Sequence, residues 1–253
     1  MDEALRDGLR KVRGARNAAL AFKRPTVAIR SVVPYLRDLR EYRRLGGAAP
    51  LAIISPQFGQ DTGTQTAEPQ YFHQAGWAAR HIGERRPRTH YDIGGQAGFL
   101  AVLTGIADVV GVELRPLTNR MPHMLNVSGD LLALPFADRT LPSLSCLHVI
   151  EHVGLGRYGD RLDPRGTEKA AAELARVLAP DGALYVTLPI SGVTRTEFNG
   201  HRVHEVDHVL AMFDSLTVFD FAVVDDVGEF LPHQNPSDEW NLHHGLGLFA
   251  FAR

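Results

Sequence analysis

The sequence predicts an α/β fold with a doubly wound, mostly parallel seven-stranded sheet and a helical N-terminal extension. From residue 89 onward, short apolar segments alternate with segments of helical spacing, which is typical of parallel strands joined by helices. A glycine-rich segment follows the first of these strands and opens a helix. The 253 residues are 44% hydrophobic, so they can supply a sizeable core. We expect residues 1–85 to form the extension and residues 86–253 to form a ligand-binding domain.

The N-terminal extension begins with a basic arm. Its first 50 residues contain twelve Lys or Arg, from Arg6 to Arg44, and five acidic residues. Apolar residues there are spaced like helix faces and are interrupted by Pro25 and Pro34, so we predict two helices packed on the main domain. The charge is typical of a solvated helical face, and the alternative is a site for an anionic substrate or a membrane surface. A short strand and a helix are predicted next, over Leu51–Ser55 and Tyr71–Ile82.

The ligand-binding domain is predicted to contain five strands and then a different C-terminal arrangement. The five strands are Thr89–Ile93, Asp108–Glu113, Leu125–Val127, Leu144–His148 and Ala183–Leu188. Helices are predicted over Gly98–Gly105 and Thr167–Val177, and a turn over Ala179–Gly182 separates the second helix from the next strand. A helix over Glu205–Asp214 and two strands over Leu216–Val224 and Leu246–Phe251 then close the sheet antiparallel.

Charge and composition disfavour several partners and locations. The net charge of −2 gives no overall attraction to nucleic acid or to an anionic membrane. Cys146 is the only cysteine, so no intrachain disulfide can form and a reduced, cytoplasmic setting is favoured. No segment approaches the roughly 20 apolar residues that span a bilayer, and the Arg-rich start lacks the apolar core of a signal peptide. We expect a mature chain that begins near Met1, has no membrane span and is compatible with a homodimer.

A candidate ligand site follows the first two strands. Asp92, Gly94, Gly95 and Gly98 lie after the first strand, where glycines let the backbone approach a ligand and a helix start can hold polar groups. Glu113 ends the second strand 21 residues after Asp92, where a carboxylate can accept both hydrogen bonds of a ribose diol. Each feature alone has an ordinary explanation, namely a tight turn and a solvated strand end.

The third strand is followed by Asp130 and Leu131. A carboxylate at this strand end can accept the amino group of adenine, with Leu131 against the ring. The ordinary explanation of Asp130 is a turn-forming residue.

These segments, followed by Leu134-Pro135-Phe136, resemble the class I S-adenosylmethionine-dependent methyltransferases. The resemblance covers about Thr89 to Leu188 and implies a Rossmann-like methyltransferase domain that binds S-adenosylmethionine. The residues implied to bind the cofactor are Asp92, Gly94, Gly95, Gly98, Glu113, Asp130, Leu131 and His148. The chain departs from the pattern at Gln96, where the family usually has Gly, and at Leu141-Pro142, where many members have Phe-Asp.

A narrower resemblance involves three other segments. Tyr71–Gln74, His148–Asp160 and Phe198–Arg202 look like a poorly characterised methyltransferase-like family of bacteria and nematodes. That family is associated with surface-polysaccharide genes, so this resemblance implies a carbohydrate acceptor.

The fourth strand leads into His148, Glu151 and His152. If a helical turn begins at His148, the three side chains share one face, and two imidazoles with a carboxylate suit a divalent metal. His-x-x-Glu-His resembles the Glu-x-x-Glu-His metal motif of the small-RNA 2′-O-methyltransferases and the ubiquinone-pathway O-methyltransferases. Those families add a downstream His, for which His201 or His204 is available.

The same histidines have metal-free interpretations. His148, His152, His201 or His204 can act as the general base, because imidazole accepts a proton near neutral pH. His152 can instead bond only the backbone. Nearby Arg157, Tyr158 and Arg202 are candidates to bind a polar acceptor, and the alternative for them is a solvated loop.

The function that these features favour is methyl transfer from S-adenosylmethionine to a hydroxyl of a small molecule. A carbohydrate is the first choice of acceptor, another hydroxylated metabolite the second and RNA the third. The alternatives are a non-catalytic methyltransferase-like binding protein and a zinc metallopeptidase that uses His148-x-x-Glu151-His152, a motif that belongs inside a long helix. A nicotinamide oxidoreductase is disfavoured because Gly94, Gly95 and Gly98 do not spell Gly-x-Gly-x-x-Gly.

Overall fold

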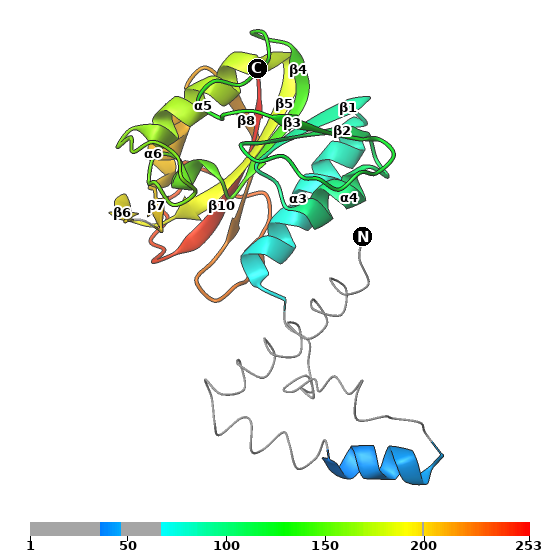
Figure 1. Cartoon of the computed structure of the whole chain (residues 1–253). Helices are drawn as coiled ribbons and strands as arrows, with labels where there is room; N and C mark the ends of the chain where they lie inside the picture. The colour runs from blue at the N-terminus through cyan, green and yellow to red at the C-terminus, as the bar shows by residue number, and fades with distance from the viewer. Residues whose placement is uncertain (1–35, 47–66, 199) are drawn as a thin grey trace. The chain divides into compact units, whose positions relative to one another are not determined.

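The computed structural model describes residues 36–46, 67–198 and 200–253. The second of two compact units, residues 67–253, is built around an eight-stranded sheet (Figure 1). Five strands run parallel, in the order β3 (Met124–Ser128), β2 (Asp108–Glu113), β1 (Thr89–Ile93), β4 (Leu141–Leu147) and β5 (Leu178–Ile190). Antiparallel strands complete it, namely β10 (Gly245–Ala252), β8 (Thr217–Val224) and β9 (Phe230–Leu231). The predicted doubly wound, mostly parallel α/β sheet is confirmed, and two-residue β9 is its unpredicted eighth strand.

Helices cover both faces of this sheet (Figure 1). One face packs against α5 (Gly166–Val177) and α6 (Val206–Met212), and the other packs against α3 (Pro69–Arg85) and α4 (Ala97–Leu103). Along β5, Tyr185 joins the core under α3 and α4, whereas Leu184 and Val186 join the core under α5. This alternation follows from the two-residue repeat of a strand, and it explains why β5 is apolar without interruption.

Helix α3 belongs to the sheet domain. Pro69 occupies its first turn, and the Glu68 side chain accepts a hydrogen bond from the Tyr71 amide at 2.8 Å, which caps its start. The Trp77 indole N–H donates to Asp220 on β8 at 3.0 Å. The predicted extension over residues 1–85 includes this helix, and the two compact units of the structure meet after Thr66.

Two local features differ from the sequence-based expectation. The segment 179–182, expected as a turn, lies within β5 as an irregularity where Asp181 has φ 61° and the β4–β5 register shifts. Strands β6 (Arg195–Glu197) and β7 (His201–Val203) form a separate hairpin that was not predicted. Three-residue strands with charged side chains carry too little apolar alternation to be recognised.

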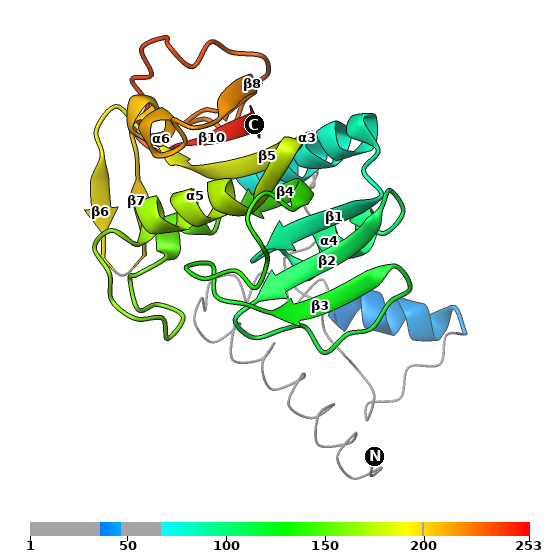
Figure 2. The same ribbon diagram turned by 90° about the horizontal axis from the view of Figure 1, so that it is seen from above.

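The order of the strands determines where a ligand can bind. Figure 2 shows β1 between β2 and β4, and the chain order reverses at this point, with β2 and β3 on one side and β4 and β5 on the other. In open α/β sheets, ligands bind outside the carboxyl ends of the strands at such a switch point. Asp92, Glu113 and His148 all lie at this edge.

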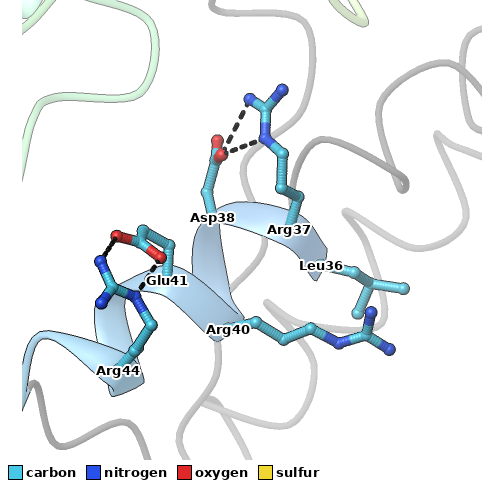
Figure 3. A pocket seen from close by; sticks show the side chains of 6 residues that line it. All are labelled: Leu36, Arg37, Asp38, Arg40, Glu41 and Arg44. Atoms are coloured by element: carbon cyan, nitrogen blue, oxygen red, sulfur yellow. Dashed lines mark hydrogen bonds and ion pairs between the residues drawn. The ribbon is translucent and has the colours of Figure 1, made fainter.

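The first unit, residues 1–66, is described only over residues 36–46, where residues 36–44 are helical. A hollow beside this helix is lined by Leu36, Arg37, Asp38, Arg40, Glu41 and Arg44 (Figure 3). The ion pairs Arg37–Asp38 and Arg44–Glu41 join exposed side chains of this one helix, and such pairs contribute little to stability. The predicted strand Leu51–Ser55 and most of the predicted helices of the basic arm lie outside the described residues. Among the described helices, none is both long enough and apolar enough to cross a membrane.

Candidate active site

The loop after β1 needs its glycines. Gly94 has φ 73°, and its amide donates to Val112 on β2 at 3.0 Å. A Cβ at Gly94 would lie 2.7 Å from Val149 in the loop after β4, and one at Gly95 would overlap the Asp92 carboxylate. Gly98 is exposed at the start of α4, and a Cβ there would have no atom of the described residues within 4 Å. The loop therefore lies close against the β4 loop and leaves open space beside Gly98.

Asp92 is fully buried at the end of β1. Ser145 on β4 donates a hydrogen bond to its Oδ2, and Ser145 is bonded in turn to His90 at 2.8 Å. Burial raises the pKa of Asp92 to about 7, although the Ser145 hydrogen bond lowers it. Sequence reasoning missed His90 and Ser145, and their signal was polar residues within otherwise apolar strands.

Glu113 and Asp130 lie at the ends of β2 and β3. Glu113 is partly exposed, burial raises the pKa of its carboxyl group, and its carboxylate forms no hydrogen bond or ion pair with the residues that the structure describes. Asp130 is exposed, and its Oδ1 accepts the Leu132 amide at 2.9 Å, so it stabilises its own turn. Leu131 is buried in the core with Ile93. Glu113 is thus the carboxylate at this edge that is available to a ligand's hydroxyl groups.

His148, Glu151 and His152 converge at the end of β4. The His148 amide still donates to Thr187 on β5 at 2.8 Å, but its φ of 62° turns the chain away from the sheet. A short 3₁₀ helix, η2 (Ile150–His152), follows, so the helical turn begins two residues after His148. Glu151 is fully buried, its Oε1 contacts His148 Nδ1, and this oxygen lies 3.6 Å from His152 Nε2. The long helix that the metallopeptidase interpretation requires is not formed here.

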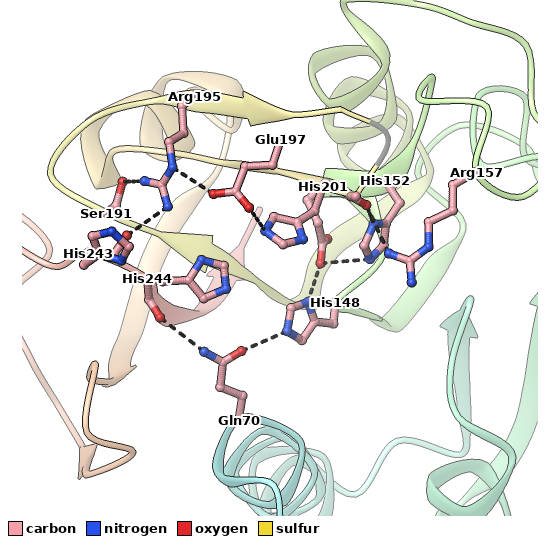
Figure 4. Close-up of polar contacts among 12 residues, drawn as sticks. Gln70, His148, His152, Arg157, Ser191, Arg195, Glu197, His201, His243 and His244 are labelled. Carbon is pink, nitrogen blue, oxygen red and sulfur yellow. Dashed lines mark hydrogen bonds and ion pairs between the residues drawn. The ribbon is translucent and has the colours of Figure 1, made fainter. Parts of the chain in front are cut away.

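The outer nitrogens of both imidazoles are occupied. His152 Nδ1 donates to the Gly200 carbonyl at 2.7 Å, and His148 Nε2 lies 3.2 Å from the Gln70 side-chain oxygen (Figure 4). These partners orient the rings so that His148 Nδ1 and His152 Nε2 face Glu151. The Glu151 Oε2 atom is buried and has no hydrogen-bond partner in the part of the chain that the structure describes. The ligand atoms of this triad lie within 4.8 Å of one another, so the donor set fits a cation.

The two downstream histidines lie in different places. The His201 ring centroid is 6.2 Å from that of His152, and His201 lies 3.2 Å from Glu197. His204 is buried, has Nδ1 3.2 Å from Nδ1 of His208, and is not part of the His148 triad. Of the two downstream histidines, His201 is the one whose ring lies beside His152.

The polar residues around the triad have distinct roles. Arg202 is buried and donates to the Val153 carbonyl at 2.6 Å and the Asp163 carbonyl at 2.9 Å, so it holds loops together. Arg157 donates to the Gly200 carbonyl at 3.1 Å. Tyr71 and Tyr158 are exposed, and their rings lie 5.2 Å from His148 and 5.7 Å from His152. Tyr71 is part of a segment that the sequence singled out, but its place beside His148 was not predicted.

Comparison with known sequences identifies one family. A family described as "Caenorhabditis protein of unknown function, DUF268" matches residues 138–224, which include η2 and the β6–β7 hairpin. No curated protein matches the sequence significantly.

Solved structures resemble the fold at low sequence identity. The crystal structure of the [4+2]-cyclase SpnF has a TM-score of 0.54 and 12% identity, and the match covers 88% of this chain and 93% of that one. The N-methyltransferase NodS from Bradyrhizobium japonicum WM9, in complex with S-adenosyl-L-homocysteine, has a TM-score of 0.50 and 16% identity over 76% of this chain and 92% of that one. A geranyl diphosphate methyltransferase in complex with S-adenosylmethionine has a TM-score of 0.50 and 16% identity, and the match covers 72% of this chain and 84% of that one. The sheet domain of this chain has the Rossmann-like fold of the class I S-adenosylmethionine-dependent methyltransferases.

Proposed function

We propose that this protein transfers a methyl group from S-adenosylmethionine to a hydroxyl of a small molecule, with a sugar or oligosaccharide as the first choice. The observation that carries the proposal is the common edge of the sheet around the switch point. The Glu113 carboxylate, which has no partner among the described residues, lies there at the end of β2, and the imidazoles of His148 and His152 follow β4. One half of this edge suits a nucleoside, and the other half suits proton transfer.

The residues present fit the cofactor. Glu113 can accept both ribose hydroxyls, because no residue in the described part of the chain occupies its carboxylate. Asp130 retains one carboxylate oxygen for the adenine amino group. The Gly94–Gly98 loop leaves open space beside Gly98 for the amino-acid end. S-adenosylmethionine, when bound, supplies a methyl group on a positively charged sulfur.

His152 is the base that this geometry favours in a metal-free reaction. Its Nδ1–H is committed to the Gly200 carbonyl, so Nε2 carries the free lone pair. Burial lowers the pKa of His152 by more than the nearby Glu151 carboxylate raises it, so the net shift is downward and the ring is neutral near pH 7. The acceptor oxygen bonds to the methyl carbon as the carbon–sulfur bond breaks, and His152 Nε2 takes the hydroxyl proton. Alignment of the reacting atoms provides much of the acceleration.

The two exposed tyrosines support a carbohydrate acceptor. Tyr71 and Tyr158 come from α3 and from the loop after η2, and each lies beside one ring of the histidine pair, Tyr71 beside His148 and Tyr158 beside His152. Sugar rings present apolar C–H faces that pack on aromatic rings, while their hydroxyl groups need polar partners. Aromatic walls around a few polar groups are the usual form of such a site.

A divalent metal at the triad is a further part of this proposal. His148 Nδ1, Glu151 and His152 Nε2 would hold it, with Gln70 and the Gly200 carbonyl as outer partners of the two rings. Two imidazoles favour a transition metal over magnesium. A bound metal would lower the pKa of the acceptor hydroxyl. If metal-stripped protein, verified by elemental analysis, keeps full turnover, the metal has no role and His152 remains the base.

Calorimetry with S-adenosylmethionine and S-adenosylhomocysteine tests the cofactor half. Glu113→Ala is expected to weaken binding by roughly 10- to 150-fold, because a hydrogen bond to a charged group is typically worth about 1.5–3 kcal/mol. The control is Glu84→Ala, which removes an exposed carboxylate on α3 and should leave affinity unchanged. Equal affinity of wild type and Glu113→Ala would contradict the assignment.

A turnover assay tests the chemical half. Wild-type protein is incubated with S-adenosylmethionine and a panel of sugars, oligosaccharides and other hydroxylated metabolites, and S-adenosylhomocysteine is measured. We expect release with at least one carbohydrate, and loss of release without loss of cofactor affinity in His152→Ala. Cofactor binding without turnover on any acceptor would favour the non-catalytic alternative.

A further inference from the structure

The hairpin β6–β7 contributes a second histidine cluster beside the first one. Glu197 on β6, His201 on β7 and His244 just before β10 place one ligand atom each within 4.8 Å of one another. Figure 4 shows the side chains of His201 and His244 turned toward the space between the hairpin and His148. We propose that these three residues bind a second divalent transition-metal ion, separate from the His148–Glu151–His152 triad.

Distances within the cluster suit such an ion. Ligands about 2.1 Å from a tetrahedral zinc lie about 3.4 Å from one another. Glu197 Oε2 and His201 Nε2 are 3.2 Å apart, and the ring centroids of His201 and His244 are 5.1 Å apart. His201 Nε2 is buried and makes no hydrogen bond with the described residues, although the Glu197 carboxylate is near. Glu197 Oε2 and His201 Nε2 thus lie at the spacing of two metal ligands without a hydrogen bond between them, as expected if both bind one ion.

The Glu197 carboxylate is already held in position. Arg195 donates to Glu197 Oε1 at 2.9 Å, which leaves Oε2 for the ion. Arg195 is fixed in turn by the Ser191 hydroxyl at 2.9 Å and the His243 carbonyl at 3.1 Å. Outer partners of this kind orient metal ligands and reduce the entropy that binding costs.

The backbone around His244 is held equally well. Asp226 accepts the His243 amide at 2.9 Å and the His244 amide at 2.7 Å. The His244 carbonyl lies 3.4 Å from the Gln70 side-chain nitrogen, and the oxygen of the same amide faces His148. Gln70 therefore links the two clusters, and an ion at Glu197, His201 and His244 would tie the hairpin to the start of β10.

Two imidazoles and one carboxylate determine which ion is expected. This donor set is the one that Zn²⁺ uses in open sites with a fourth position for water, and Co²⁺ has similar preferences. The inference goes beyond the proposed methyl transfer, because it needs neither the methyl donor nor an acceptor.

Titration of the full-length, metal-stripped protein with Co²⁺ tests the proposal, because the visible absorption of this ion reports its coordination. The variants Glu197→Gln and His244→Ala remove one ligand each, and Glu197→Gln keeps the shape of the side chain. The matched control is His243→Ala, whose exposed side chain is not part of the cluster. His148→Ala removes a ligand of the first triad only.

We expect the equivalent of Co²⁺ held by Glu197, His201 and His244 to be lost in Glu197→Gln and in His244→Ala and to be retained in His243→Ala and His148→Ala. An equivalent held by the first triad would be lost in His148→Ala alone. Identical stoichiometry and spectra in wild type, Glu197→Gln and His244→Ala would overturn the proposal and leave His201 and Glu197 as an ordinary ion pair. The proposed function fails separately. If His148→Ala and His243→Ala both bind as much Co²⁺ as wild type while Glu197→Gln and His244→Ala bind one equivalent less, the first triad holds no metal and the second site stands. Calorimetry with S-adenosylmethionine reports the cofactor site in every variant.

Discussion

Replacing Asp92 by Asn is expected to change how stability depends on pH. Asp92 is fully buried, and burial raises its pKa from 3.8 to about 7. In the unfolded chain the carboxyl group ionises near its ordinary pKa, so above that pH the unfolded state releases a proton that the folded state keeps. This difference favours unfolding increasingly as the pH rises from about 4 to about 7. An amide cannot ionise, and its oxygen can still accept the hydrogen bond from Ser145.

The size of the effect follows from the two pKa values. With a pKa of 3.8 unfolded and about 7 folded, ionisation of Asp92 lowers the free energy of unfolding by about 2 kcal/mol at pH 5 and about 4 kcal/mol at pH 8. Wild type should therefore lose about 2–3 kcal/mol between these two pH values from this residue alone. Other titrating groups act in both proteins, so they cancel when the pH-dependent change in Asp92→Asn is subtracted from that in wild type.

Urea denaturation of the cofactor-free protein at pH 5 and pH 8 measures this difference. The free energy of unfolding of Asp92→Asn, relative to that of wild type, is expected to rise by about 2–3 kcal/mol from pH 5 to pH 8. Ser215→Ala, at a position between α6 and β8, serves as a control that should follow wild type. If Asp92→Asn and wild type change equally between the two pH values, Asp92 ionises normally in the folded state and the reasoning is wrong.

Two more predictions concern single residues. Gly94→Ala should lower the free energy of unfolding by more than about 1 kcal/mol and weaken cofactor binding, because φ is 73° and the added Cβ would lie 2.7 Å from Val149. In the same denaturation assay, the control Gly76→Ala should raise the free energy of unfolding by about 0.5–1 kcal/mol, because this position lies in α3 and a Cβ there meets no atom of the described residues. Burial lowers the pKa of His204 to about 4. Below about pH 6.5 the unfolded chain therefore binds a proton at His204 that the folded protein does not bind, so the free energy of unfolding falls as the pH drops from 6.5 to 4. His204→Gln should flatten this acid dependence in thermal unfolding, and an unchanged profile would refute the assignment of His204 as a buried neutral imidazole.

The local pattern of the sequence was sufficient to predict seven of the eight strands of the sheet. Strands β1 and β2 have the predicted bounds, Thr89–Ile93 and Asp108–Glu113, because short apolar segments flanked by helices have few other stable arrangements. The glycine-rich loop was recognised for the same reason, since the positive φ of Gly94 is a local requirement. These signals lie within a few residues of one another along the chain.

Only the tertiary structure decided which side chains meet. Gln70, His148 and His244 come from α3, from the end of β4 and from the start of β10, and no local spacing relates them. The predicted metal set of His148, Glu151, His152 and His201 is divided by the structure, because the hairpin places His201 with Glu197 and His244. Likewise, the hydrogen-bonded chain from His90 through Ser145 to Asp92 exists because β1 and β4 are neighbours. Secondary structure depends on periodicity within one segment, whereas the site depends on the order of strands in the sheet, which brings distant loops to one edge.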